Sequence, residues 1–211
     1  GARFVLKNLC DILGETAPSD ISCADNPLLL LGNEPAGRQR FMRILGRALL
    51  LNSFGMELSA AQAELPAVTG LYTHFMHDET YCPDQSRLTE ALLRIQDIVS
   101  SMPCGAAVLM DEPMVGTGLV EGQQLCLDTL ECIRILQGYA VLGTHNTELS
   151  LPIGRAWRLS ENRLIPFDQS ELFDYLIRSL DLSETFGMSD NKDDLSELDA
   201  RIISAFRKVT K

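Results

Sequence analysis

The sequence predicts a layered α/β fold built on a mostly parallel sheet. Short apolar runs flanked by Gly or Pro alternate with helical patterns through the first 166 residues, as they do in such sheets. With 211 residues, 45% of them hydrophobic and 22% charged, the composition is that of an ordinary globular domain. No apolar run approaches the about 20 residues that span a bilayer, so we expect a soluble, cytoplasmic protein without membrane contact.

The expected strands are short and apolar, as buried parallel strands are. They cover residues 28–31, 68–75, 106–110 and 139–142. The segments between them carry apolar residues at helical spacing, which predicts helices over residues 37–51, 88–99 and 119–136. The resulting order is strand, helix, strand, helix.

The segment after Pro152 predicts two further elements, and the composition changes after residue 180. Residues 155–167 predict two short strands around Glu161 and Asn162, and residues 170–180 predict a helix. A Ser-, Asp- and Gly-rich acidic linker over residues 183–194 precedes an expected amphipathic helix over 195–209. We therefore expect one domain over residues 1–167 and a short helical extension over 168–211.

Charge and cysteine usage limit the possible functions. The net charge of −11 repels the phosphate backbone of nucleic acids, so any DNA is expected to be held by other domains of a larger protein. The six cysteines form no Cys-x-x-Cys pair, which favours free thiols in a reducing cytoplasm.

His74 and His77 lack nearby ligands at zinc spacing, and we expect both to be structural. The first expected helix carries four arginines: Arg38, Arg40, Arg43 and Arg47. They permit contact with an anion or a nucleic acid, or form a solvated helix face, and we assign them no role.

The segment from Leu28 to Gln39 places a strand, a G-x-x-x-x-G turn and a helix start in the order of a phosphate-binding loop. Glycines at both ends let backbone amides surround an anion, and a helix N-terminus adds partial positive charge. The motif then calls for Lys and for Ser or Thr, but this chain has Arg38 and Gln39. An ordinary Gly-Pro turn before a helix remains the alternative interpretation.

Two further strands are expected to end in polar side chains. Asp111 and Glu112 follow the apolar run 106–110, where a fold with such a phosphate-binding loop holds magnesium and its catalytic base. Thr144 and His145 follow the next strand, where a γ-phosphate could be contacted. Taken alone, the carboxylates could be solvated groups and the histidine a surface side chain.

Together these motifs resemble the ATPase domain of the MutS mismatch-repair family. The resemblance covers residues 26–151, and its strength lies in the matched order of several weak motifs. They are the phosphate-loop-like turn, Asp84-Gln85-Ser86, Asp111-Glu112 with Gly116-Thr117, and Thr144-His145 with Glu148-Leu149. Leu71 to Phe75 also resembles a strand of that family.

The resemblance implies a P-loop NTPase fold of the ABC ATPase type, a three-layer sandwich that binds ATP and Mg²⁺. Asp111 would hold the metal, and Glu112 and His145 would be catalytic. The implied nucleotide-binding residues are Gly32, Asn33, Glu34, Pro35, Ala36, Gly37, Arg38 and Gln39, with Ser86 contributed in trans. Such domains pair through the ATPase face, so we expect a homo- or heterodimer.

Two functions follow as hypotheses. The first is a MutS-like ATPase domain that binds ATP, and hydrolyses it slowly if at all, in DNA mismatch repair or related DNA processing. The second is a non-catalytic P-loop module for dimerisation or partner binding. Arg38 and Gln39, which replace the expected Lys and Ser or Thr, leave the choice open. A different ABC-type ATPase would carry a Ser-Gly-Gly-type signature, which this chain lacks.

Overall fold

The computed structural model describes residues 4–10, 21–23, 26–75, 87–114, 119–153, 156–160 and 163–167. The strands are β1 (Phe4–Lys7), β2 (Ile21–Cys23), β3 (Leu28–Leu31), β4 (Gln62–Glu64), β5 (Leu71–Phe75), β6 (Ala107–Asp111), β7 (Tyr139–Thr144), β8 (Ala156–Ser160) and β9 (Arg163–Pro166). The helices are α1 (Pro35–Ser53), α2 (Arg87–Ser101), α3 (Leu119–Ile135), the 3₁₀ turn η1 (Thr147–Leu149) and α4 (Ser150–Ile153).

Six strands form the main sheet, in the order β5-β6-β7-β3-β8-β9. The neighbours from β5 to β8 are parallel, and only β9 runs antiparallel, to β8. The four residues of β3 are all buried, which accounts for their unbroken run of leucine in a strand that lies between β7 and β8. The expected mostly parallel sheet is confirmed.

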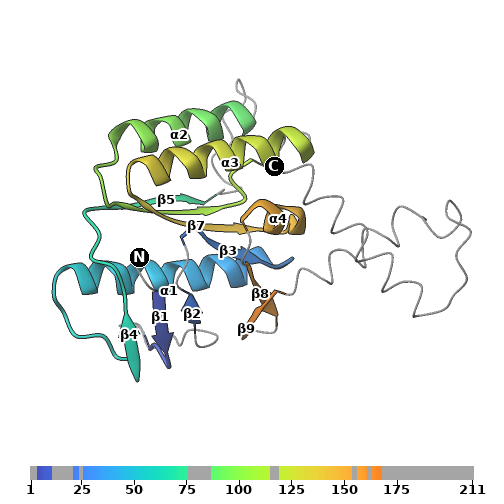
Figure 1. Ribbon diagram of the computed structural model, residues 1–211. Helices are drawn as coiled ribbons and strands as arrows, with labels where there is room; N and C mark the ends of the chain where they lie inside the picture. The colour runs from blue at the N-terminus through green and yellow to red at the C-terminus, as the bar shows by residue number, and fades with distance from the viewer. Residues whose placement is uncertain are drawn as a thin grey trace, which may run out of the picture. The chain divides into compact units, whose positions relative to one another are not determined.

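Helices cover both faces of this sheet. Figure 1 shows α1 on one face and the neighbouring α2 and α3 on the other. Two apolar clusters fill the layers: α1 contributes Phe41, Ile44 and Leu45 to the first, while α2 and α3 contribute Ile95 and Ile133 to the second. The chain therefore has a helix–sheet–helix architecture, which is compatible with a Rossmann-like or P-loop-like sandwich.

Three outcomes refine the sequence prediction. The two short strands expected within residues 155–167 are confirmed as β8 and β9. The strand expected from residue 68 begins at Leu71, and the helix expected over 37–51 begins earlier, at Pro35, and ends at Ser53. The expected helices over 170–180 and 195–209 and the linker over 183–194 lie outside the described residues, and the domain division stays a prediction.

A small antiparallel sheet was not predicted. It has the order β2-β1-β4, and β1 pairs with both neighbours. Phe4, Leu6 and Leu9 are buried in the same cluster as the inner face of α1. This sheet therefore extends the core beyond the six-stranded sheet. Among the described residues, no helix is long and apolar enough to cross a membrane.

Candidate functional site

The candidate site lies where β3, β6 and β7 end. The last residue of β3, Leu31, is in register with Thr144, and Asp111 is in register with Gly143. The carboxyl ends of adjacent parallel strands meet at one edge of the sheet, which is where ligands bind in open α/β folds. The carboxylates and the Thr144-His145 pair predicted from separate motifs are thus brought together.

Arg38 occupies the centre of this site. Its side chain is 1% exposed, and its Nε donates to Asp111 Oδ1 at 2.7 Å. One terminal nitrogen donates to Glu112 Oε1 at 2.9 Å, and the other donates to the carbonyl oxygen of Gly32. Arg38 therefore joins both predicted acids to Gly32, the residue that follows β3.

Gln39 completes the hydrogen bonding of the buried carboxylate. Its Nε2 donates to Asp111 Oδ2 at 3.1 Å, so each oxygen of Asp111 accepts from a side chain of α1. Asp111 is 2% exposed. Burial of a carboxylate is tolerated only when it is paired and hydrogen-bonded, and both conditions are met here.

Glu112 is held in a backbone conformation that side chains seldom adopt. Its φ is 47°, in the left-handed region, and its amide donates to the carbonyl oxygen of Gly143 at 2.9 Å. The carboxylate then accepts from Thr144 Oγ1 at 3.1 Å and from the amide of His145 at 2.6 Å. His145 Nδ1 lies 2.7 Å from Glu112 Oε1. Strained residues of this kind concentrate at functional sites.

Gly143 makes room for the ion pair. A Cβ at this position would lie 2.6 Å from Asp111 Oδ1 and 2.5 Å from the terminal methyl of Met42, closer than side-chain atoms pack. It would also lie 3.4 Å from Cδ of Arg38. The absence of a side chain on β7 therefore allows Arg38 and Asp111 to meet.

The connection between β3 and α1 is shorter than a phosphate loop requires. Pro35 occupies the first turn of α1, so only Gly32, Asn33 and Glu34 separate the strand from the helix. Ala36 and Gly37 belong to the helix itself. Glu34 is the N-cap residue, and its Oε2 lies 3.7 Å from the place that a Cβ on Gly37 would take. A carboxylate thus lies by the helix end that would attract an anion.

Most of the residues implied by the resemblance lie at this edge of the sheet. The whole segment from Gly32 to Gln39, Asp111, Glu112 and His145 belong to the described part of the chain. Ser86 and the Gly116-Thr117 pair lie outside the described residues. The roles of these residues in binding and catalysis stay predictions.

Sequence reasoning missed several supporting residues. Gly143 was not singled out, and the bond from Thr144 Oγ1 to Glu112 was not predicted. Asn146 caps η1 by accepting from the amide of Glu148 at 3.0 Å, and Gln123 Nε2 donates to Glu148 Oε2 at 2.7 Å. These bonds connect the end of β7 to α3. Asparagine before a short helix is a readable capping signal.

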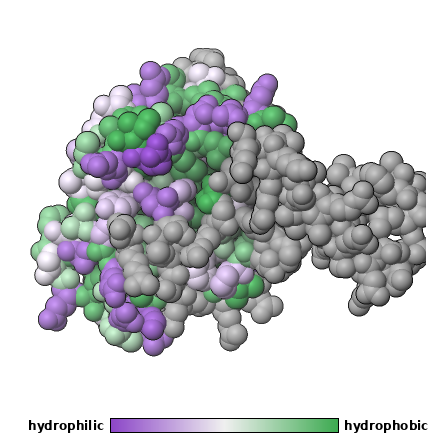
Figure 2. All heavy atoms as spheres, in the orientation of Figure 1, coloured by the Kyte–Doolittle hydropathy of each residue, from purple (hydrophilic) through white to green (hydrophobic). Residues whose placement is uncertain are grey.

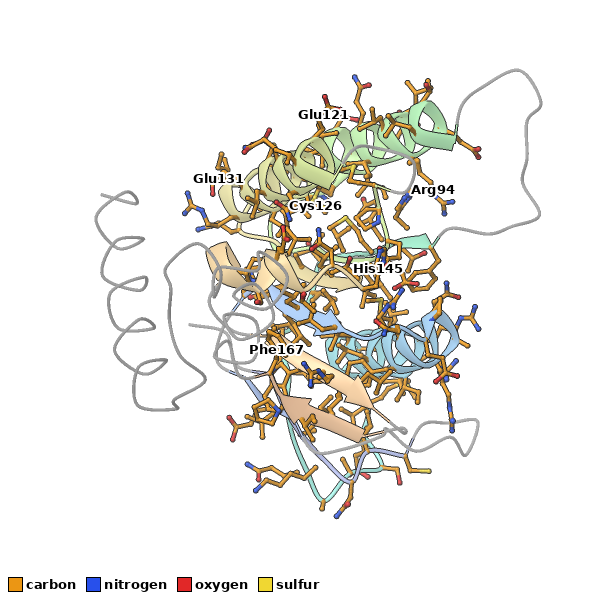
Figure 3. The ribbon with its side chains drawn as sticks, turned by 90° about the vertical axis from the view of Figure 1, so that its right-hand side faces the viewer. Arg94, Glu121, Cys126, Glu131, His145 and Phe167 are labelled. Carbon is orange, nitrogen blue, oxygen red and sulfur yellow. The ribbon has the colours of Figure 1, made fainter. Side chains whose placement is uncertain are left out.

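Two buried groups near the site have shifted pKa values. Burial, reinforced by the charge of Glu112, raises the pKa of the Cys126 thiol to about 12. Burial, reinforced by Arg94, lowers the pKa of His74 to about 4. Figure 3 shows Cys126 on α3, Arg94 on α2 and His145 near the sheet. Both groups are therefore neutral at pH 7.

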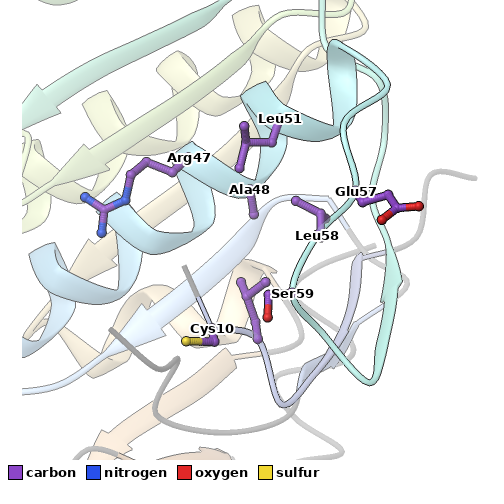
Figure 4. A pocket seen from close by; sticks show the side chains of 8 residues that line it. Cys10, Arg47, Ala48, Leu51, Glu57, Leu58 and Ser59 are labelled. Carbon is purple, nitrogen blue, oxygen red and sulfur yellow. The ribbon is translucent and has the colours of Figure 1, made fainter. Parts of the chain in front are cut away.

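A separate pocket lies away from these residues. It is a cavity of about 110 Å³ between α1 and residues 57–59, lined in part by Cys10, Arg47, Leu51 and Ser59 (Figure 4). Pockets that hold drug-sized ligands measure roughly 300–1,000 Å³. This cavity is too small for a nucleotide.

Comparison with curated proteins gives partial similarity to the DNA mismatch repair protein MutS. The chain is 26% identical over 136 residues to MutS of Thermus aquaticus, covering 64% of this chain and 17% of that protein. It is 26% identical over 133 residues to MutS of Thermus thermophilus, covering 63% and 16%. It is 23% identical over 139 residues to MutS of Petrotoga mobilis, covering 64% and 17%.

The chain is distantly homologous to MutS. The homology is weak and partial, because this chain spans only 16–17% of the length of those relatives. No family model matches the chain. The MutS resemblance inferred from the motifs is therefore supported at the level of distant homology.

Proposed function

We propose that the chain is a MutS-related P-loop domain that does not hydrolyse ATP and serves as a non-catalytic module in DNA mismatch repair or related DNA processing. The observation that carries this proposal is the contact of Arg38 with both predicted catalytic acids. A guanidinium there provides, from within the chain, positive charge that a magnesium ion would otherwise supply. If this guanidinium left the site, the negative charges of Asp111 and Glu112 would lie close together without the positive charge between them.

The carboxylates as arranged do not fit a magnesium ion. Both oxygens of Asp111 accept hydrogen bonds from α1, and both oxygens of Glu112 also have donors. Magnesium requires free oxygen ligands at about 2.0–2.1 Å in octahedral geometry. Gln39 presents its NH₂ group to Asp111, where the motif calls for a metal-binding hydroxyl.

The size of the ion-pair energy decides whether magnesium–ATP could displace Arg38. Displacing Arg38 gives up its hydrogen bonds to Asp111 and Glu112, each worth about 1.5–3 kcal/mol because the groups are charged, or about 3–6 kcal/mol together. Since every 1.4 kcal/mol changes affinity tenfold, this cost weakens a micromolar site to about the millimolar range. Glu34 by the start of α1 adds repulsion toward a phosphate.

A titration with a fluorescent ATP analogue tests this proposal, with and without magnesium. We expect no saturable binding by the wild type below about 1 mM, from the displacement cost above. The Arg38→Lys, Gln39→Ser variant removes the guanidinium that bridges both acids and restores a hydroxyl, so we expect this variant to bind the ATP analogue more tightly than the wild type. Adding Glu34→Ala should strengthen binding further. Micromolar binding by the wild type would overturn the proposal.

The environment of Glu112 favours a second candidate, slow ATP hydrolysis. Glu112 is 17% exposed and lies within 2.7 Å of the exposed ring of His145, so a water molecule could reach the pair. Phosphate release by the purified wild type that disappears in the Glu112→Gln variant would support this candidate. The same low rate in both proteins would exclude it.

A further inference from the structure

The solvent-facing side of α1, together with the C-cap residue Phe54, carries a regular stripe that the proposed function does not use. Its members are spaced three and four residues apart: Arg40, Arg43, Arg47, Leu50 and Phe54. Such spacing places them on one side of a helix, within roughly 21 Å of its length. Arg40 and Arg43 are exposed, Leu50 is 37% exposed and Phe54 is 77% exposed. We name this set the α1 stripe.

The solvent-facing side of α3 carries a stripe of opposite charge at identical spacing. Its members are Glu121, Gln124, Asp128, Glu131 and Ile135, which we name the α3 stripe. Figure 3 shows Glu121 and Glu131 on the outer side of α3, and Ile135 is 66% exposed. Figure 2 shows hydrophilic side chains, with hydrophobic ones between them, over the helical layer at the top of the view.

The two stripes are complementary at three of their five positions when the helices run parallel, while Arg43 lies opposite Gln124 and Leu50 lies opposite Glu131. Arg40 then lies opposite Glu121, and Arg47 lies opposite Asp128. At the far end the exposed ring of Phe54 meets Ile135. The alternation of three and four residues averages 3.5, which is the repeat that lets two helices stay in contact along a seam. The charged pairs and the apolar pair at one end favour this single register.

Internal contacts leave the charges of Arg40 and Arg43 available. Arg40 and Arg43 are exposed, whereas Arg47 is half-buried and already interacts within the chain, so the first two supply most of the accessible positive charge. On α3, Glu131 pairs with Arg134 at 2.6 Å, with both side chains more than half exposed. Such an exposed pair is weak and can rearrange.

One chain cannot join its own stripes, because α1 and α3 cover opposite faces of the sheet (Figure 1). We propose that the α1 stripe of one copy of this chain docks against the α3 stripe of a second copy. Such a contact is head-to-tail, so each copy keeps one free stripe and further copies add in series or close a ring. The contact does not involve the edge of the sheet where Arg38 lies.

The salt dependence of self-association separates this contact from its alternatives. The net charge of −11 makes copies repel one another, and added salt would weaken that repulsion and favour contacts made by apolar residues alone. If the charged stripes pair, added salt should instead weaken self-association, because salt screens the attraction between arginine and carboxylate. A seam of two short stripes is a small interface, so the association is expected to be weak.

Sedimentation velocity of the full chain at about 0.5 mM, a concentration suited to weak interfaces, tests the proposal. We expect the mean sedimentation coefficient to rise with protein concentration at low salt and to return to the monomer value at about 0.5 M salt. Either the Arg40→Glu, Arg43→Glu variant or the Glu121→Lys, Asp128→Lys variant should abolish association.

Mixing these two charge-reversed variants gives the sharpest result. Each variant alone presents like charges on both of its helices, whereas the mixture again offers opposite charges, so association should return. The Glu90→Lys, Asp97→Lys variant is the matched control: it reverses two exposed acids on α2 and changes net charge equally with the α3 variant, and it should leave association intact.

Three results would overturn the proposal. They are a monomer at all concentrations at low salt, a control variant that loses association as the stripe variants do, and a mixture of variants that stays monomeric. Gel retardation of an oligonucleotide by monomeric wild type, lost in the arginine variant, would reassign the α1 stripe to nucleic-acid contact.

Discussion

Replacing Arg38 by methionine should cost this protein a large part of its stability. Arg38 and Asp111 are 1% and 2% exposed, so the variant leaves a buried carboxylate that has lost its charged partner. Breaking a buried pair costs about 3–5 kcal/mol, against a typical total of about 5–15 kcal/mol. With a urea dependence of ~2 kcal/mol per molar, the unfolding midpoint should fall by about 1.5–2.5 M.

Arg134→Met is the matched control for this measurement. Arg134 makes an equally short ion pair with Glu131, but both partners are more than half exposed. An exposed pair contributes about 0–1 kcal/mol, so the control should unfold close to the wild type. The double variant Arg38→Met, Asp111→Asn should be more stable than Arg38→Met alone, because it removes the uncompensated charge. If both arginine variants lost the same small amount, our account of a buried ion pair would be refuted.

Three more predictions concern stability, pH and thiol reactivity. Gly143→Ala should lower the free energy of unfolding by about 1–3 kcal/mol, because its Cβ would crowd Asp111; wild-type stability in urea would contradict the close packing. The pKa of His74 is lowered by burial to about 4, so the unfolded chain binds more protons between pH 6.5 and 4. Stability should therefore fall as pH decreases through that window, by at most about 2 kcal/mol at pH 5, and urea midpoints of His74→Phe should lack this share of the loss. Cys126, whose pKa burial raises to about 12, should resist alkylation at pH 8 while exposed Cys132 reacts, as peptide mass spectrometry would show; equal labelling would contradict the burial.

The main sheet could be predicted from the sequence because its strands are continuous apolar runs. Leu28–Leu31 and the strand ending at Asp111 are buried on both faces, and that burial requires apolar residues at every position. The small N-terminal sheet could not be predicted in this way. Its strands have three or four residues, too few for a period to be recognised, and β4 is exposed throughout.

The meeting of the acids with the Thr144-His145 pair was predictable, but the place of Arg38 was not. Carboxyl ends of parallel strands share one edge, so the motif order was sufficient to bring Asp111 toward Thr144. The orientation of Arg38 depends on where α1 begins. Helical side chains point toward the N-terminus of their helix, and a start at Pro35 therefore directs the guanidinium back toward Gly32.

Proline at residue 35 was a readable signal for that helix start. Proline is favoured in the first turn of a helix, but the expected phosphate loop assigned Pro35, Ala36 and Gly37 to a turn instead. Ser86 and the Gly116-Thr117 pair lie outside the described residues, so the predicted contribution across a dimer stays a prediction. Because α1 begins at Pro35, Glu34 becomes its N-cap residue and lies by the helix start.

The central claim is that Arg38 holds Asp111 and Glu112 in place of a magnesium ion, and NMR of the Arg38 Nε–H group tests it most directly. We predict a sharp, slowly exchanging resonance, assigned by its loss in Arg38→Lys and shifted in Asp111→Asn, that does not change when magnesium and ATP are added at about 0.1 mM, well below the expected millimolar dissociation constant. A resonance that exchanges rapidly with water, or that moves on addition of magnesium and ATP, would contradict the account.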